Sequence, residues 1–281
     1  MSQHVSRLVF TIILSIVTLF VMFKQFILLL ACFFLYLLSY AQWQWSNPQP
    51  SGYINYNITF TGTNDGFILN SNGDLIHTTD GGSRWKIQQH FPNTTMMELL
   101  DSTGIIAGYN GTIFISPDNG STWNNVLFPY SGSLNQVNIV SRDSLFMLRT
   151  SSTTGATELC LSTNRGTTWK ITGSRLYIRS FQFLNATTGY TAFDDGMYKS
   201  TDGGSSWQLV YRYPTTERFT LFKFLNENVG YAYKGSTGIL KTTDGGKTWI
   251  ASASTIYNAL YCFYLVSNTV AYAARRKRVD L

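Results

Sequence analysis

Short apolar runs alternate with small groups of glycine, asparagine and aspartate over most of the chain after residue 42. The last complete example has apolar runs at Phe219–Phe224, Gly230–Tyr233, Gly238–Thr242 and Thr248–Ala251, each separated from the next by turn-forming residues. Short runs with this punctuation are typical of β-strands joined by tight turns. The pattern therefore predicts a unit of four antiparallel strands, and it predicts an all-β protein because the unit recurs.

The recurrence is clearest in the stretch "KTTDGGKTW", which ends at Trp249. Related stretches end at four earlier tryptophans, and successive tryptophans lie 38, 46, 38 and 42 residues apart. A four-stranded unit of about 40 residues buries its faces only by stacking against its neighbours around an axis. The sequence therefore predicts a β-propeller with five full blades and a partial sixth.

The copies share the pattern Ser/Thr, any, Asp, any, Gly, any, Ser/Thr, Trp, which defines an Asp box, also called a BNR repeat. Two copies depart from it at one position, the first with Arg84 in place of the second Ser/Thr and the third with Asn164 in place of Asp. The box positions that we expect to be structural are Asp80, Gly82, Trp85, Asp118, Gly120, Trp123, Asn164, Gly166, Trp169, Asp202, Gly204, Trp207, Asp244, Gly246 and Trp249.

We interpret the box aspartate as a hydrogen-bond acceptor for the turn and the tryptophan as a side chain packed between blades. Asn164 supports this interpretation, because an amide keeps the acceptor oxygen and loses the charge that an acid or a metal ligand needs. Each loop offers one carboxylate, whereas a calcium loop uses several. The cysteines also lack metal-ligand spacing. We therefore expect no metal and no cofactor.

The unit "N…GY-x-A…GILKTTDGGKTW", with Asn226, Gly230, Tyr231 and Ala232, resembles the photosystem II stability/assembly factor family of Asp-box propellers. That family is related to the sialidase-like propellers, and the resemblance covers roughly residues 42–273. It implies a non-enzymatic scaffold that binds a protein partner or assists assembly. Two alternatives remain open, a sialidase-like glycoside hydrolase and a repeat module of a cell-surface adhesin.

Catalytic residues are not evident in the sequence. No stretch matches the arginine triad of sialidases, and a two-carboxylate glycosidase needs a matched acidic pair. Among the glutamates after residue 41, only Glu217 is well placed for a cleft. Asp194 and Asp195 are candidates for its partner, although a hairpin turn also explains them. We expect the protein not to be an enzyme.

The loops that join one unit to the next are rich in tyrosine and arginine, the residue types favoured at binding hot spots. We expect a binding face on the side of the propeller opposite the boxes; an alternative is that these residues only cover blade edges. The candidates are Arg175, Tyr177, Arg179, Tyr211, Arg212, Tyr213 and Arg218. A protein partner is favoured over nucleic acid because the hydrophobic leader described next leads us to expect an exported chain.

Residues 1–41 form a hydrophobic leader. Residues 22–41 have a basic start, an apolar centre and small residues before a cleavage point after Ala41, which indicates a signal peptide. The alternatives are an uncleaved anchor over residues 8–40 and a lipoprotein signal at Cys32. All three place the rest of the chain outside the cytoplasm, as a secreted, periplasmic or cell-surface protein. Membrane contact is expected only through an uncleaved leader.

The two ends of the repeat region modify this picture. Trp45 precedes Phe60 by the interval that separates Trp207 from Phe222, so a strand near residue 45 is expected to complete the last blade. The sixth unit supplies two strands and then gives way to a basic tail, residues 274–281, which we interpret as an interrupted repeat. Four of the basic residues lie in this tail, and the net charge of +6 is compatible with an anionic partner without indicating one.

Overall fold

The chain divides into two compact units, Met1–Ser46 and Asn47–Leu281. The computed structural model describes residues 53–173, 178, 180–214, 218–235, 238–252, 260–265, 267 and 271–275. The leader, the strand expected near Trp45 and most of the basic tail lie outside these residues. Within the described part of the chain, no helix has both the length and the apolar character that a membrane span requires.

Five four-stranded antiparallel sheets, here called blades 1 to 5, follow one another along the chain. Blade 1 contains β1 (Asn55–Phe60), β2 (Gly66–Asn70), β3 (Asp74–Thr78) and β4 (Lys86–His90). Blade 2 contains β5 (Thr94–Leu100), β6 (Thr103–Gly108), β7 (Thr112–Ser116) and β8 (Asn124–Leu127), with a short 3-10 turn η1 (Tyr109–Gly111) before β7. Blade 3 contains β9 (Gly132–Ile139), β10 (Leu145–Ser151), β11 (Thr157–Ser162) and β12 (Lys170–Gly173).

The later blades repeat this order. Blade 4 contains β13 (Ser180–Phe183), β14 (Gly189–Ala192), β15 (Gly196–Ser200) and β16 (Gln208–Arg212). Blade 5 contains β17 (Leu221–Phe224), β18 (Gly230–Lys234), β19 (Gly238–Thr242) and β20 (Ile250–Ala251). A two-stranded sheet, β21 (Leu260–Leu265) with β22 (Ala271–Arg275), forms a partial blade. The predicted fold, five full propeller blades and a partial one, is confirmed.

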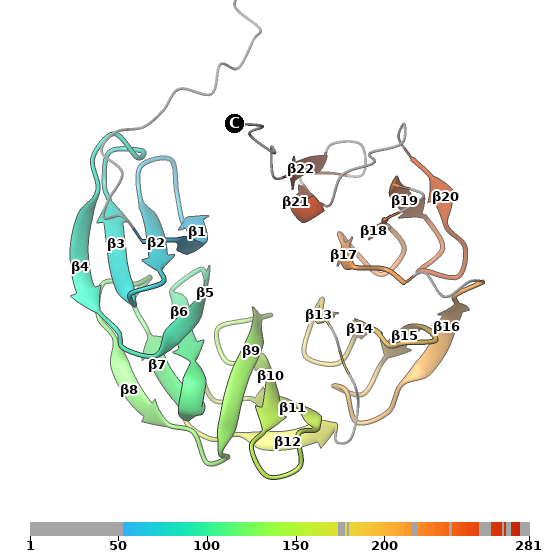
Figure 1. Cartoon of the computed structure of the whole chain (residues 1–281), viewed down its shortest axis with the longest axis horizontal. Coiled ribbons are helices and arrows are strands. Elements are labelled where there is room, and N and C mark those ends of the chain that lie inside the picture. Colours follow the sequence, from blue (N-terminus) through green and yellow to red (C-terminus); the bar gives the residue numbers. More distant parts are fainter. Residues whose placement is uncertain are drawn as a thin grey trace, which may run out of the picture. The chain divides into compact units, whose positions relative to one another are not determined.

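The first strand of each blade lies nearest the axis, and the fourth lies at the periphery (Figure 1). Each inner strand contacts the inner strand of the next blade, in the order β1, β5, β9, β13, β17 and β21. This order follows from the sequence, because every unit presents its four strands in the same succession. It brings together side chains that lie about 40 residues apart in the chain.

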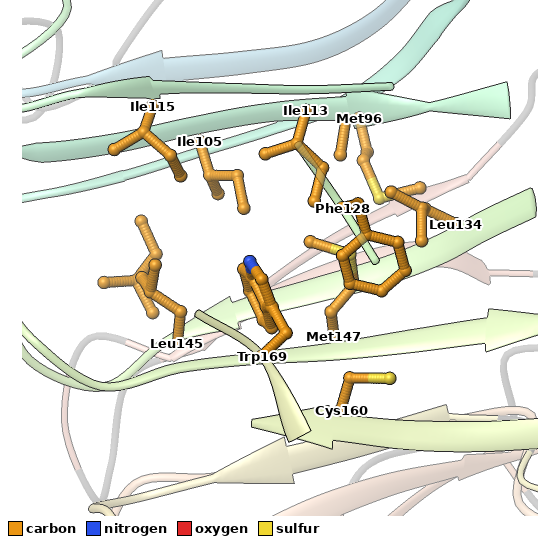
Figure 2. Close-up of a cluster of buried hydrophobic side chains, with 12 residues drawn as sticks. Met96, Ile105, Ile113, Ile115, Phe128, Leu134, Leu145, Met147, Cys160 and Trp169 are labelled. Atoms are coloured by element: carbon orange, nitrogen blue, oxygen red, sulfur yellow. The ribbon is translucent and has the colours of Figure 1, made fainter. Parts of the chain in front are cut away.

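The hydrophobic core is divided among the seams between adjacent blades. Figure 2 shows the seam between blades 2 and 3, where Ile105 and Ile113 face Leu145 and Met147. Cys160 is buried at the same seam, and burial raises the pKa of its thiol to about 12. Strands such as β6 are buried on both faces because each blade has a neighbour on either side. Burial of apolar area at these seams is the main stabilising contribution.

The box tryptophans fill these seams from one side. Trp123 packs against Phe91 of the connection between blades 1 and 2, with the ring centroids 5.7 Å apart. Trp169 packs against Phe128 in the same way, with the ring centroids 5.6 Å apart. Trp169 is 6% exposed. Trp207 packs against the core of the seam between blades 3 and 4, and Trp249 packs against the core of the seam between blades 4 and 5. Each of these four tryptophans therefore lies on the face of its blade that meets the preceding blade.

Candidate functional site

The box turn is a closed network of hydrogen bonds, best seen in the fifth copy. The hydroxyl of Thr242 accepts the backbone N–H of Gly246 at 2.9 Å and donates to the Asp244 carboxylate at 2.8 Å. The same carboxylate accepts the backbone N–H of Lys247 at 3.0 Å and of Thr248 at 2.9 Å. The aspartate thus satisfies donors of its own turn, the task for which short polar side chains suit turns.

The third box makes the same backbone contact with an amide. The Asn164 carboxamide oxygen accepts the backbone N–H of Thr168 at 2.9 Å, and its NH₂ group donates to the Thr168 hydroxyl at 2.8 Å. In the first box, where Arg84 replaces the second hydroxyl residue, Asp80 still accepts the Arg84 backbone N–H at 2.8 Å. Charge is therefore not needed for this turn.

Glycine is needed at the fifth position of the box. Gly166 has φ +77°, and a Cβ there would lie 2.9 Å from the Ile115 side chain of blade 2. Left-handed backbone and close approach to the neighbouring blade both exclude a larger residue. This position therefore fixes the box against the seam as well as shaping the turn.

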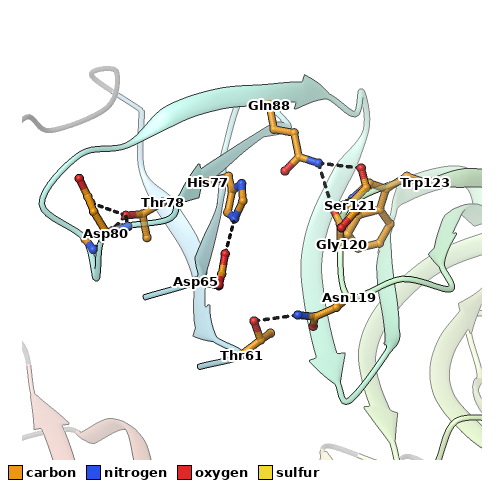
Figure 3. Close-up of polar contacts among 11 residues, drawn as sticks. Thr61, Asp65, His77, Thr78, Asp80, Gln88, Asn119, Gly120, Ser121 and Trp123 are labelled. Atoms are coloured by element: carbon orange, nitrogen blue, oxygen red, sulfur yellow. Dashed lines mark hydrogen bonds and ion pairs between the residues drawn. The ribbon is translucent and has the colours of Figure 1, made fainter. Parts of the chain in front are cut away.

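The second box is also tied to blade 1 by polar contacts (Figure 3). Gln88 of β4 donates to the carbonyl of Gly120 at 2.8 Å, and Asn119 donates to the Thr61 hydroxyl at 3.0 Å. Thr172 of β12 makes a similar contact, at 2.8 Å, to the carbonyl of Gly203 in the fourth box. Boxes therefore join blades as well as closing turns.

Two box carboxyl groups have strongly lowered pKa values. The hydroxyl and backbone N–H of Ser206 lower the pKa of Asp202 to about 2, and those of Thr248 do the same for Asp244. Both groups are hydrogen-bonded in their ionised form, which is the usual cause of such a shift. In the described part of the chain, no group of three His, Cys, Asp or Glu side chains is placed to hold a metal ion.

Two arginines of the expected binding face are held by the turn between the second and third strands of blade 4. Arg212 pairs with Asp195 at 3.2 Å, and Arg218 pairs with Asp194 at 3.0 Å. Tyr198 also donates to the Asp195 carboxylate at 2.9 Å. The connection between blades 4 and 5 and the turn at residues 194 and 195 therefore lie on one face, with Arg212 67% exposed along its side chain.

Tyr213 is a correction to the expected face, because it is only 8% exposed. Its ring packs edge-on against Phe219 at 5.0 Å, and burial raises the pKa of its hydroxyl to about 12. Tyr211 is half-buried and stacks on the same Phe219 ring at 5.7 Å. Tyr213 therefore belongs to the seam between blades 4 and 5. Arg175, Tyr177, Arg179 and Glu217 lie outside the described residues.

A set of amide side chains around the axis was not anticipated from the sequence. Gln136 donates to the carbonyl of Phe181 at 2.6 Å and accepts its N–H at 3.1 Å. Gln182 makes the same pair of contacts with Phe224, at 2.9 and 2.7 Å. These amides satisfy the free edge of the next inner strand, whose polar groups would otherwise lack partners. For Gln182 the sequence signal was a polar residue between two aromatic ones, Phe181 and Phe183.

Asn57 and Asn138 extend this arrangement. Asn57 accepts the N–H of Met97 at 3.1 Å, and Asn138 accepts the N–H of Phe183 at 2.6 Å. Glu98 of β5 has an equivalent role, since its carboxyl accepts the N–H of Ile139. Burial raises the pKa of Glu98 to about 7, against the opposing attraction of Lys223.

These inner-strand residues surround a cavity of about 690 Å³ on the axis. Glu98 and Lys223 both line it, together with polar residues of β9 and the aromatic rings of Tyr56, Phe181 and Tyr264. The structure thus offers two candidate regions for a ligand, this axial channel and the face that carries Arg212. The boxes form neither region.

Four-stranded blades with box turns in each of the five complete repeats define an Asp-box β-propeller. The family described as "Photosynthesis system II assembly factor YCF48" matches residues 37–172. A solved structure described as "YCF48 bound to D1 peptide" is similar, with a TM-score of 0.52 and 14% identity over 80% of this chain and 91% of that one. The chain is therefore a YCF48-like propeller of the Asp-box (BNR) type.

The same fold occurs in enzymes. A GH74 xyloglucanase from Xanthomonas campestris has a TM-score of 0.58 and 14% identity, over 79% of this chain but only 41% of the enzyme. Regucalcin from Agrobacterium tumefaciens, a calcium-binding protein, has a TM-score of 0.52 and 15% identity over 73% of this chain. No curated protein sequence matches the chain. Similarity at these sequence identities establishes the fold, and the function has to be inferred from the residues of the site.

Proposed function

We propose that the protein is an exported, non-enzymatic propeller that binds a protein segment and serves as an assembly scaffold. The observation that carries this proposal is the exposed face on which Arg212 and Arg218 are held by Asp195 and Asp194. A YCF48 structure with a bound D1 peptide supports it, because a propeller of similar fold accommodates a peptide. The apolar leader supports export.

The geometry of this face suits recognition. Each guanidinium is held in position by a carboxylate, so less side-chain entropy is lost when a partner binds. Arg212 and Arg218 remain 67% and 38% exposed along their side chains. Arginine at such positions forms hydrogen bonds in a fixed planar geometry, which suits the carbonyl and carboxylate groups of a peptide. We infer that this face contributes the polar contacts of the complex.

The experiment is recovery of cross-linked partners from the native host, using the tagged full chain and two variants. Arg212→Gln with Arg218→Gln removes both guanidinium groups and is expected to reduce the recovered partner by about tenfold. Arg84→Ser is the matched control, since it removes an exposed arginine from the first box and restores the box pattern. Equal recovery with all three proteins would overturn the assignment of this face.

Glycoside hydrolysis is the second candidate, favoured by the fold shared with the GH74 enzyme. Assays with xyloglucan and with a sialoside separate the two proposals. We expect no turnover of either substrate. Turnover that is lost in Glu217→Gln would establish the hydrolase and end the scaffold proposal.

A further inference from the structure

One position of the inner strand repeats in all five complete blades. The cross-strand pairing aligns one residue of each inner strand with the Ser or Thr that begins the box of the same blade. We call the residue immediately before that aligned residue the belt position. The cross-strand pairing places Thr59, Glu98, Asn138, Gln182 and Lys223 there. All five are polar, but only Glu98 and Lys223 carry charge.

The structural task of the belt position does not require charge. Asn138 and Gln182 accept the backbone N–H of the next inner strand as neutral amides, at 2.6 and 2.7 Å. Glu98 accepts the equivalent N–H of Ile139 with a carboxylate, whose ionisation burial opposes. Lys223 has no acceptor atom for such an N–H. The hydrogen bonding of the fold therefore requires neither charge, and both charged side chains line the axial cavity, which points to a role in binding.

The two charges face the same space from opposite sides of the axis. Glu98 lies on β5 and Lys223 on β17, strands that stand across the ring from each other (Figure 1). Both line the axial cavity, and the two side chains attract each other without a direct ion pair. A ligand with one positive and one negative group would satisfy both at once.

The other residues that line the cavity indicate that the ligand also has an apolar part, next to its two charged groups. Met97 and Phe181 are buried in the wall, and Tyr56 and Tyr264 contribute exposed rings. The volume of about 690 Å³ lies within the range of small-molecule sites. We propose that the axial channel binds a zwitterionic ligand, a free α-amino acid with an apolar side chain, whose ammonium contacts Glu98 and whose carboxylate contacts Lys223.

This site is separate from the face proposed to bind a protein, so each proposal can fail alone. The test is isothermal titration calorimetry of the full chain with L-phenylalanine, 2-phenylethylamine and 3-phenylpropanoate. These probes share the ring and carry both charges, only the ammonium or only the carboxylate. We expect L-phenylalanine to bind at least about tenfold more tightly than either analogue.

Two variants test which charged group of the ligand each side chain contacts. The residue that they introduce already occurs at the belt position of blade 4. Glu98→Gln and Lys223→Gln both install the residue that Gln182 already places at the belt position, so the fold is retained. Each variant should weaken L-phenylalanine binding by at least about tenfold. Glu98→Gln should leave 3-phenylpropanoate binding unchanged, and Lys223→Gln should leave 2-phenylethylamine binding unchanged. No binding of L-phenylalanine, or equal binding by all three proteins, would overturn the proposal.

Discussion

Gln182 and Phe224 are joined by two hydrogen bonds across the seam between blades 4 and 5. The side-chain amide accepts the Phe224 N–H at 2.7 Å and donates to its carbonyl at 2.9 Å. Inner strands have no strand beyond them on the axial side, so a side chain of the preceding blade completes their hydrogen bonding. The contact therefore links local strand chemistry to the assembly of the ring.

Removal of this amide should loosen the seam. We expect Gln182→Ala to lower the free energy of unfolding by about 1–3 kcal/mol, because a buried N–H and a buried carbonyl lose their partner. Gln208→Ala is the matched control at an exposed position of the same blade, with an expected change within about 0.5 kcal/mol. Urea unfolding followed by circular dichroism measures both. Similar losses in the two variants would contradict the role assigned to Gln182.

The fifth box provides a graded series. Asp244→Asn should be mild, because Asn164 already makes the equivalent contact in the third box. Asp244→Ala should cost more, about 1–3 kcal/mol where the stranded donors are buried and less where water reaches them. Chemical denaturation of the variants gives the order. A larger loss in Asn than in Ala would show that the carboxylate has another role.

The buried tryptophan of the third box should matter most for stability. We expect Trp169→Ala to cost about 3–5 kcal/mol, because it opens a cavity in the seam between blades 2 and 3. Trp249→Ala should cost less, since Trp249 is only half-buried. The same unfolding measurement compares them, and equal costs would contradict a dependence on burial.

Acid should weaken the boxes that contain aspartate. The folded pKa values of Asp202 and Asp244, about 2, lie below the ordinary value of 3.8. Their contribution to stability is therefore complete above about pH 4 and is lost as the pH falls towards 2. The double variant Asp202→Asn, Asp244→Asn should lose less stability over that interval. Unfolding curves at pH 6, 4 and 2.5 test this, and parallel losses in both proteins would contradict it.

Glu98 should act in the opposite direction. Its folded pKa of about 7 lies above the ordinary value of 4.5, so the folded state favours the protonated carboxyl. Stability is therefore lost as the pH rises from about 4.5 through 7. Glu98→Gln should be the more stable protein at pH 8, by about 1–2 kcal/mol after allowance for water in the channel. The difference should vanish at pH 4, and its persistence there would contradict the titration of Glu98.

Export is tested at the N-terminus. We predict that the protein produced in its host begins at Gln42, because small residues at 39 and 41 fit a signal-peptidase site. N-terminal sequencing of the secreted protein measures this. A chain that keeps residue 1 or 2 and sediments with membranes would favour the anchor instead.

The sequence predicts the repeat well because each box encodes its own turn. Glycine, aspartate and hydroxyl residues within a few positions determine that turn, and the strands follow by pairing with their nearest neighbours. The five blades could therefore be read locally, and in the fifth blade the strand Gly238–Thr242 has the predicted limits, whereas the first and fourth strands begin two residues later than predicted. Tyr213 could not be assigned in this way, because whether a loop tyrosine is exposed depends on Phe219 and the next blade.

The axial channel illustrates the same limit. Glu98 and Lys223 lie more than a hundred residues apart in sequence, and only the closing of successive blades around an axis places them in one cavity. The polar residues of the inner strands were visible in the sequence. Their cross-blade hydrogen bonds were not, because these depend on which strand edge lies opposite each side chain.

The placement of the box tryptophans gives the ring a direction of assembly. Trp169 completes the seam behind its own blade, so blade 2 has an uncovered apolar face until the third box has been synthesised. During translation, we expect each blade to become resistant to protease only after the next repeat has left the ribosome. Ribosome-bound chains arrested just before and just after Trp169 would show this delay as a change in cleavage within blade 2. Maturation of the protein would then lag its synthesis by one repeat.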